Sequence, residues 1–203
     1  MKKIFLHQNA DSGDLIVVFG GFASHPSHFS HLKSQKNVLL FFDYEDFSLE
    51  FDFKAFENIT LIAFSMGVCV ASKMMRSLPL GAKIALNGTN QPIDRNLGIH
   101  PGIFRKNLEN FSLKAFKKSL LAEREKLAQD FEFKDEAGLK KELGNLLDFC
   151  QKERHLAFEW DRVYASAHDE IFPTKAIKKS FGAPIFLNEP HFAFFAFDFW
   201  EEL

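Results

Sequence analysis

The sequence predicts an α/β fold with a mostly parallel central sheet and flanking helices. Short, continuous apolar runs recur along the chain, as in strands that are buried on both faces of a parallel sheet. Longer segments of helical composition separate several of these runs, so strand, helix and strand alternate as right-handed crossovers require. A chain of 203 residues is long enough for one domain with a substantial core.

Seven apolar runs are the predicted strands. LIVVF leads into Gly20-Gly21 and VLLFF leads into Asp43, so loops are expected where these strands end. In chain order the runs are Ile4–Leu6, Leu15–Phe19, Val38–Phe42, Ile59–Phe64, Lys83–Leu86, Val163–Ala165 and Pro184–Leu187.

Helices are predicted at Met66–Ser77, Thr174–Ser180 and Phe192–Leu203. Between about residues 100 and 155 the strand pattern stops, and charged segments with apolar residues at helix-like intervals replace it. We interpret this stretch as a helical lid inserted into a single domain. The predicted domain spans 1–203, with a core of 1–99 and 156–203 and a lid of 100–155.

Composition and charge exclude several classes of function. A net charge of -2 gives no reason to expect nucleic-acid binding. The chain has no apolar run long enough for a membrane helix, and its first residues lack the apolar core of a signal peptide. Two cysteines, Cys69 and Cys150, do not indicate a disulfide framework. A cytoplasmic protein is expected.

Ser65 lies in AFSMG, a small-x-Ser-x-Gly sequence between the predicted strand ITLIAF and the predicted helix MGVCVASKMM. This is the pattern of a nucleophile elbow, in which a sharp strand-to-helix turn exposes the serine. Ala63 replaces the first glycine and adds only one methyl group. The pattern predicts an α/β-hydrolase with Ser65 as nucleophile, whereas the alternative is a serine that merely caps a helix.

A serine nucleophile needs a base and an acid, and in this fold they follow it in the order acid, then histidine. Asp169 and His191 each come just after a predicted strand, where such sheets build their sites. His168 is a weaker candidate for the base because no strand separates it from Asp169. Asp161 ranks second as the acid because it precedes its strand.

The oxyanion needs backbone N–H donors, and those of Met66 and Phe22 are the candidates. Gly20-Gly21 favours the turn that would aim the Phe22 N–H, although a plain turn remains an alternative. His25, His28 and His31 fall at three-residue intervals, for which a metal site is one interpretation, but hydrogen-bonded or solvated histidines are favoured. No metal or cofactor is expected.

The chain resembles the BioG-type pimeloyl-acyl-carrier-protein methyl ester esterases of biotin synthesis. The resemblance covers most of the chain and rests on VVFGGFA, AFSMGVCVA, ALNGTNQPIDRNLGIHPGIF, VYASAHDEIFP and PHFAFF. It implies a compact α/β-hydrolase with a helical lid, a triad of Ser65, Asp169 and His191, and oxyanion donors at Phe22 and Met66. Ala23 departs from the Gly-Trp-Gly pattern of the family's oxyanion loop, which puts the geometry of that loop in question.

The resemblance also implies the substrate, the methyl ester of pimeloyl-acyl-carrier protein, and hence an acyl carrier protein as partner. Acyl carrier proteins are acidic, and the lid sequence carries a surplus of basic residues that could steer docking. An ordinary solvated helix face is the alternative. The candidate docking residues are Arg105, Lys106, Lys114, Lys117, Lys118 and Arg124.

Other functions remain open from the residues alone. A thioesterase or a broad-specificity carboxylesterase would use the same triad, and a lid-containing binding module would use none of it. The Ser, acid and His in hydrolase order argue against the binding module. The oligomeric state and the chain-length selectivity are not predicted.

Overall fold

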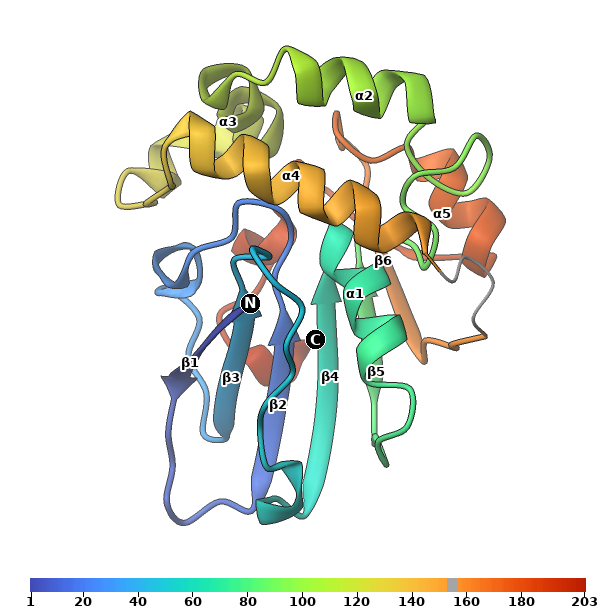
Figure 1. Cartoon of the computed structure of the whole chain (residues 1–203). Coiled ribbons are helices and arrows are strands. Elements are labelled where there is room, and N and C mark those ends of the chain that lie inside the picture. Colours follow the sequence, from blue (N-terminus) through green and yellow to red (C-terminus); the bar gives the residue numbers. More distant parts are fainter. Residues whose placement is uncertain (153–156) are drawn as a thin grey trace.

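The computed structural model describes residues 1–152 and 157–203. Within this part of the chain, seven strands form one sheet in the order β1-β3-β2-β4-β5-β6-β7 (Figure 1). The prediction of a mostly parallel sheet is confirmed, because only β1 runs antiparallel to its neighbour. The strands are β1 (Lys2–His7), β2 (Asp14–Phe19), β3 (Asn37–Phe42), β4 (Asn58–Phe64), β5 (Lys83–Leu86), β6 (Arg162–Ser166) and β7 (Ile185–Leu187).

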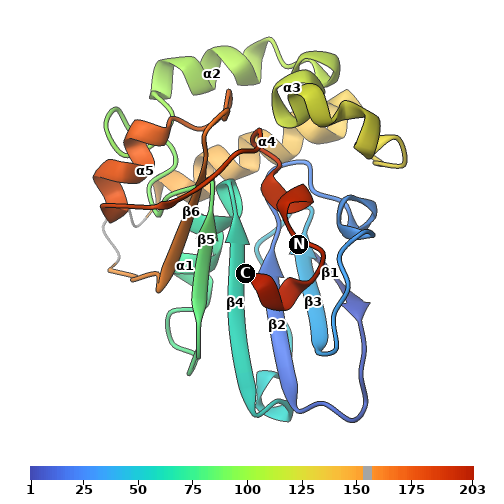
Figure 2. The ribbon, with the colours of Figure 1, turned by 180° about the vertical axis from the view of Figure 1, so that it is seen from behind.

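Both faces of the sheet are buried, which explains why its central strands are continuous apolar runs. On β2, Leu15, Val17 and Phe19 join one core cluster, whereas Ile16 and Val18 join the cluster on the opposite face. Helix α1 (Met66–Met74) and helix α5 (Thr174–Phe181) cover the first face. The C-terminal segment covers the second face, as the view from behind shows (Figure 2).

The predicted helix at Phe192–Leu203 is wrong. This segment forms two short 3-10 turns, η4 (Ala193–Ala196) and η5 (Trp200–Glu202), with extended backbone at Phe197 and Phe199 between and beside them. Phe192, Phe194 and Trp200 are buried in the core over the sheet, whereas Phe199 is exposed and forms a β-bridge with Lys33. Packing of these rings therefore outweighs the helical periodicity of the segment.

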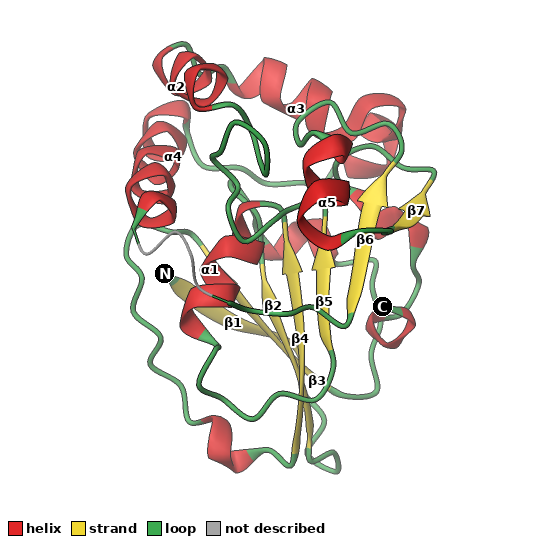
Figure 3. Ribbon diagram, turned by 90° about the vertical axis from the view of Figure 1, so that its right-hand side faces the viewer, coloured by secondary structure: helices red, strands yellow, loops and turns green. Residues whose placement is uncertain are grey.

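The segment predicted as a lid is helical and lies across the carboxyl ends of the strands (Figures 1 and 3). It consists of α2 (Pro101–Glu109), α3 (Leu113–Leu121), the 3-10 helix η3 (Ala122–Ala128) and α4 (Glu136–Gln151). Its predicted end at residue 155, and the return of the core at 156, lie outside the described residues. In the described ranges, no helix has both the length and the apolar character needed to cross a bilayer.

Candidate active site

Ser65 lies at the sharp turn from β4 into α1. Its backbone has φ 55° and ψ -123°, a conformation that costs a non-glycine residue about 1–3 kcal/mol. Tight packing enforces the turn: a Cβ on Gly67 would lie 2.3 Å from the carbonyl oxygen of Gly20, and one on Gly88 would lie 2.1 Å from that of Ser65. The neighbours of the turn must therefore be small, as the elbow pattern requires.

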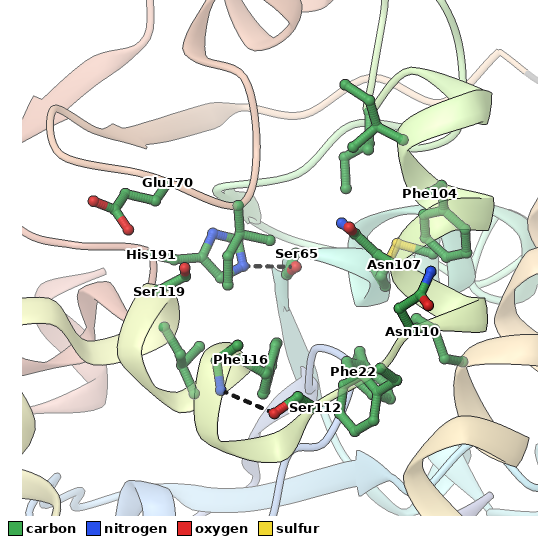
Figure 4. Close-up of a pocket in the computed structure, with 18 of the residues that line it drawn as sticks. Phe22, Ser65, Phe104, Asn107, Asn110, Ser112, Phe116, Ser119, Glu170 and His191 are labelled. Carbon is green, nitrogen blue, oxygen red and sulfur yellow. Dashed lines mark hydrogen bonds between the residues drawn. The ribbon is translucent and has the colours of Figure 1, made fainter. Parts of the chain in front are cut away.

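The structure brings the three predicted triad residues together, and Figure 4 shows the contact between two of them, His191 and Ser65. The Nε2 atom of His191 lies 2.8 Å from Oγ of Ser65, and its Nδ1 atom lies 2.7 Å from Oδ2 of Asp169. The other oxygen of Asp169 accepts the N–H groups of Ile171 and Phe172 at 2.8 and 2.7 Å. The aspartate is thus fixed on its loop, and the buried imidazole is held between acid and hydroxyl.

The two competing candidates lie elsewhere. His168 is exposed and its Nε2 atom lies 2.9 Å from Oδ1 of Asn188. Asp161 precedes β6, at the other end of the strand from Asp169, where its Oδ2 atom accepts the Lys83 N–H at 2.8 Å. Neither side chain contacts Ser65 or His191 by a hydrogen bond.

Phe22 and Met66 both line the cavity in front of Ser65. Neither backbone N–H donates to an acceptor within residues 1–152 and 157–203, so both are free to bind a developing oxyanion. Other N–H groups of the loop after β2 are engaged. Gly20 donates to the carbonyl of Phe41, and Ser24 donates to that of Gly21.

Asn87 is a site residue that sequence reasoning missed. It follows β5 with φ 47°, and its buried amide donates to the His191 carbonyl at 2.7 Å and to Ser166 Oγ at 2.8 Å. Its Oδ1 atom accepts the Ser166 N–H at 2.7 Å. This one side chain ties β5, β6 and the histidine loop together. The available signal was Asn-Gly directly after a strand, because asparagine tolerates the left-handed region.

Sequence reasoning also missed an ion pair beside the histidine. Nε and Nη2 of Arg124, in η3, donate to the two carboxylate oxygens of Glu189 at 3.0 and 2.6 Å. Glu189 is buried and lies two residues before His191. Arg124 was predicted as a docking residue, but its guanidinium is already engaged in this fork.

The other candidate docking residues follow the outer side of α2 and α3. Arg105, Lys106, Lys114 and Lys118 are exposed. Lys117 is half-buried, with its ammonium 4.4 Å from the ring centroid of Phe133. These five cations lie on the two helices that contribute most of the cavity's rim.

A cavity of about 280 Å³ opens in front of Ser65 between the sheet and the lid. Aromatic and aliphatic side chains form most of its wall. The rim, which is the part of the wall that α2, α3 and the residues between them supply, also carries the amides and hydroxyls of Asn107, Asn110, Ser112 and Ser119 (Figure 4). Its apolar lining consists mainly of Phe22, Phe64, Met66, Ile99, Phe104, Phe111, Phe116, Leu120 and Leu143. The lining is mostly apolar, with a few polar groups, as in a pocket for a small organic ligand.

The three histidines near the N-terminus do not converge on one point. His25 accepts the Ser27 N–H through Nδ1, and His31 Nε2 lies 3.1 Å from the Phe194 carbonyl. Burial lowers the pKa of His28 to about 3, so this ring stays neutral and donates through Nε2 to the Glu132 carbonyl. In the described part of the chain, no three His, Cys, Asp or Glu residues are grouped as metal ligands.

Comparison with known proteins gives a match over the full length. The model of the family described as "Pimeloyl-ACP methyl esterase BioG" matches residues 1–203. The crystal structure of BioG from Haemophilus influenzae superposes with a TM-score of 0.93 at 28% identity, covering 100% of this chain and 99% of that one. An uncharacterised protein of the same organism is 28% identical over 200 residues, 93% of each chain.

More distant relatives extend the comparison. A malonyl-[acyl-carrier protein] O-methyltransferase of Bacteroides fragilis is 29% identical over 174 residues, which are 80% of this chain but only 35% of that protein. An α/β hydrolase fold protein of Chitinophaga pinensis superposes with a TM-score of 0.62 at 16% identity, covering 94% and 86% of the two chains. A lipase-esterase related protein of Clostridium acetobutylicum gives 0.59 at 16%, covering 94% and 92%. The last two similarities concern the fold alone.

Proposed function

The chain belongs to the BioG family of pimeloyl-ACP methyl esterases, and from this membership we propose that Ser65, His191 and Asp169 carry out the esterase reaction. The observation that carries the proposal is the continuous pair of contacts from Asp169 through His191 to Ser65. The expected substrate is the methyl ester of pimeloyl-acyl-carrier protein, and the products are pimeloyl-acyl-carrier protein and methanol.

The reaction proceeds in two halves. His191 takes the proton of Ser65 as Oγ attacks the ester carbonyl, and Asp169 stabilises the imidazolium that forms. The N–H groups of Phe22 and Met66 bind the oxyanion. The tetrahedral intermediate collapses when His191 returns the proton to the leaving methoxide, and methanol departs. Water then attacks the acyl-enzyme with the same base, and pimeloyl-acyl-carrier protein leaves.

The cavity supports a substrate with an apolar acyl chain. Its floor is lined by aromatic and aliphatic side chains next to Ser65, whereas its rim carries amides and hydroxyls that can bind a polar linker. The ester end of the chain lies at Ser65, and the carrier protein then lies outside the rim. Basic residues on α2 and α3 are placed to contact an acidic carrier there.

The nucleophile is tested by labelling with a fluorophosphonate and by the Ser65→Ala variant. We expect the wild-type protein to be labelled once, at Ser65, and the variant to lose labelling and turnover while it unfolds at the same urea concentration. Removal of a triad serine lowers kcat by about 10⁶-fold in a serine protease. Wild-type protein that is folded but not labelled would rule out a serine hydrolase.

The bond that is cleaved is tested with methyl pimeloyl-acyl-carrier protein. Release of methanol with the thioester intact supports the proposed esterase. Loss of the acyl chain from the carrier would instead indicate a thioesterase, and equal turnover of unrelated small esters would indicate a broad-specificity carboxylesterase. Mass spectrometry of the carrier protein distinguishes these outcomes because each leaves a different mass on it.

A further inference from the structure

Glu142 is a buried carboxylate that the proposed reaction does not use. It lies on α4 in the lid with only 1% of its surface exposed. A carboxylate is costly to bury without partners, and burial raises the pKa of Glu142 to about 7. The position therefore calls for a reason beyond packing.

The carboxylate lies against the loop that carries the Phe22 N–H. Its Oε1 atom accepts the N–H of Ala23 at 3.3 Å, and the backbone of Tyr44 lies near enough to the same carboxylate to oppose the rise in its pKa. Lys134 lies 3.7 Å from Oε2. One lid side chain thus joins the loop after β2 to the segment after β3.

The conformation of the loop explains why it needs such an anchor. Ala23 has φ 62°, the left-handed region in which an L-residue with a Cβ is strained by roughly 1–2 kcal/mol. Gly20 and Ser24 bind backbone carbonyls through their own N–H groups. With the Ala23 N–H bound to Glu142, the Phe22 N–H stays available for substrate.

Further contacts hold the same loop, some of them from the lid. The hydroxyl of Tyr44, after β3, donates to the Gly20 carbonyl at 2.6 Å. Asn145, three residues after Glu142 on α4, in turn donates to the Tyr44 carbonyl at 3.1 Å. The ring of Phe22 packs edge-on against two lid phenylalanines at 5.5 and 5.1 Å between centroids. The position of the loop therefore depends on the lid.

We propose that Glu142 is a positioning residue for the oxyanion hole: its carboxylate holds the Ala23 N–H so that the adjacent Phe22 N–H faces the oxyanion. The inference rests on the proposed function of Ser65. It makes the lid a part of the site that stabilises the transition state, in addition to its role as a wall of the cavity.

The first test compares Glu142→Gln and Glu142→Met on a small ester, p-nitrophenyl butyrate, at pH 8. Glutamine offers one acceptor oxygen in place of two and carries no charge, so we expect kcat to fall about tenfold with little change in KM. Methionine offers no acceptor of comparable strength, and we expect a loss of about 10²-fold, the scale of a lost oxyanion donor. Asp148→Asn, an exposed acid on the same helix, is the matched control and keeps the wild-type kcat.

The second test is the pH dependence of the ratio between wild-type and Glu142→Gln kcat. The charged and titratable groups that face Glu142 are Lys134, before α4, and Asp43 and Tyr44, after β3, with Lys2 of β1 paired to Asp43. We expect the ratio to approach one as the pH falls below 7, since Glu142 is then protonated in the wild type. A merely structural role of Glu142 would leave the ratio constant across this pH range.

Urea unfolding and fluorophosphonate labelling complete the experiment. If the wild type is neither labelled nor active, the proposed function fails and the inference with it. If the wild type is active and the Gln and Met variants keep its kcat, the inference alone is overturned. It is also overturned if the variants lose kcat only in proportion to a loss of folded protein.

Discussion

Left-handed backbone is concentrated at the edge of the sheet that carries the site. Among the described residues, Ala23, Asp43, Ser65 and Asn87 all have positive φ, and they follow β2, β3, β4 and β5 respectively. Three of these positions come one residue after the strand ends. Such strain persists only where the surroundings fix it, and here buried hydrogen bonds and the close approach of glycines do so.

The strain at Asn87 gives a prediction at the scale of one side chain. Asn87→Ala removes three buried hydrogen bonds, to Ser166 and to the carbonyl of His191, and leaves a Cβ in the left-handed region. We expect the free energy of unfolding to fall by about 2–4 kcal/mol, and kcat to fall at least tenfold because the histidine loop loses its anchor. Urea unfolding and ester hydrolysis measure the two effects.

Asn87→Gly is the matched variant. It loses the same hydrogen bonds but adopts φ 47° without strain, so it should be more stable than the alanine variant by roughly 1 kcal/mol. The two variants should share the same loss of kcat. Wild-type kcat in both would show that the asparagine does not position His191.

Glu142 also predicts how stability depends on pH. Its pKa is raised from 4.5 to about 7, so between these values the native state binds more protons than the unfolded state. The contribution of Glu142 to stability is therefore fully present below about pH 4.5 and is lost as the pH rises to about 7. The full shift corresponds to about 3 kcal/mol.

Glu142→Gln removes this dependence. We expect the wild type to lose up to about 3 kcal/mol more than the variant between pH 5 and pH 8, and the variant to be at least as stable as the wild type at pH 8. Urea unfolding at both values measures the difference. Parallel pH profiles for the two proteins would contradict the raised pKa.

At the residue scale, local patterns predicted Ser65, Asp169 and His191 as a set because each follows a strand, and parallel strands end at one edge. Glu142 could not be predicted in this way. It lies in a charged amphipathic stretch where most acidic residues face solvent, and only the packed structure shows that this one faces the loop after β2. A contact between residues 119 positions apart leaves no periodic signal.

At the scale of elements, the strands were easier to predict than the helices. The central strands are buried on both faces and are unbroken apolar runs. Each of the seven strands in the described residues overlaps a predicted run, including the more exposed edge strands β1 and β7. The predicted helix at Phe192–Leu203 is wrong because its rings pack individually into the core over the sheet. The lid was predicted as a helical stretch, but the ends of its helices at Asn110 and Ala122 were not predicted. Neither position has a proline or glycine, the residues that usually mark a helix end in a sequence.

The lid element η3 gives the next prediction. Arg124 lies in its first turn and donates two hydrogen bonds to the buried carboxylate of Glu189, which lies two residues before His191. Removing the arginine leaves a buried carboxylate unpaired, which we expect to destabilise the protein, although solvent screening at the partly exposed Arg124 limits the loss. Arg124→Ala should therefore lower kcat for small esters and for carrier-bound esters by the same factor.

Lys126, on the same element, is the matched control. It is exposed and was not predicted to dock the carrier, so Lys126→Ala should leave both activities unchanged. If Arg124→Ala instead lowered kcat/KM for carrier-bound esters alone, the result would support the prediction that this arginine docks the carrier protein. The two substrates are compared by kcat/KM at one ionic strength, because salt screens exposed charges.

At the scale of the whole molecule, phenylalanine and charge are distributed in different ways. The chain has 26 phenylalanines, and only five of them line the cavity, whereas many of the others fill both core clusters. Their abundance is thus mainly a property of the core, as their spread along the sequence indicates. Charge is asymmetric, since a chain of net charge -2 carries exposed cations on α2 and α3 around the cavity's rim.

This asymmetry predicts how the carrier protein docks. Reversal of Lys114, Lys117 and Lys118 to glutamate places three negative charges on α3, which supplies part of the rim. We expect kcat/KM for methyl pimeloyl-acyl-carrier protein to fall by about 10²-fold, mainly through association, because an acidic partner is then repelled. Hydrolysis of a small neutral ester should change less than about twofold, since none of the three lysines lines the cavity.

Two controls distinguish an effect on docking from an effect on the fold: a salt titration, and the same charge reversal on a second helix. Rising salt should reduce the difference in kcat/KM for the carrier-bound ester between the wild type and the triple variant. Salt screens both attraction and repulsion between exposed charges, with a Debye length of about 10 Å at 0.1 M. A second triple variant makes the same change of charge on α5, which contributes no residue to the cavity, by reversing Lys175, Lys178 and Lys179 to glutamate. It should lower kcat/KM for the carrier-bound ester far less. Equal losses on both helices would attribute the effect to net charge alone. Equal losses of kcat/KM on the carrier-bound and the small ester would attribute the effect to damage to the fold. Either result would contradict a docking surface on α3.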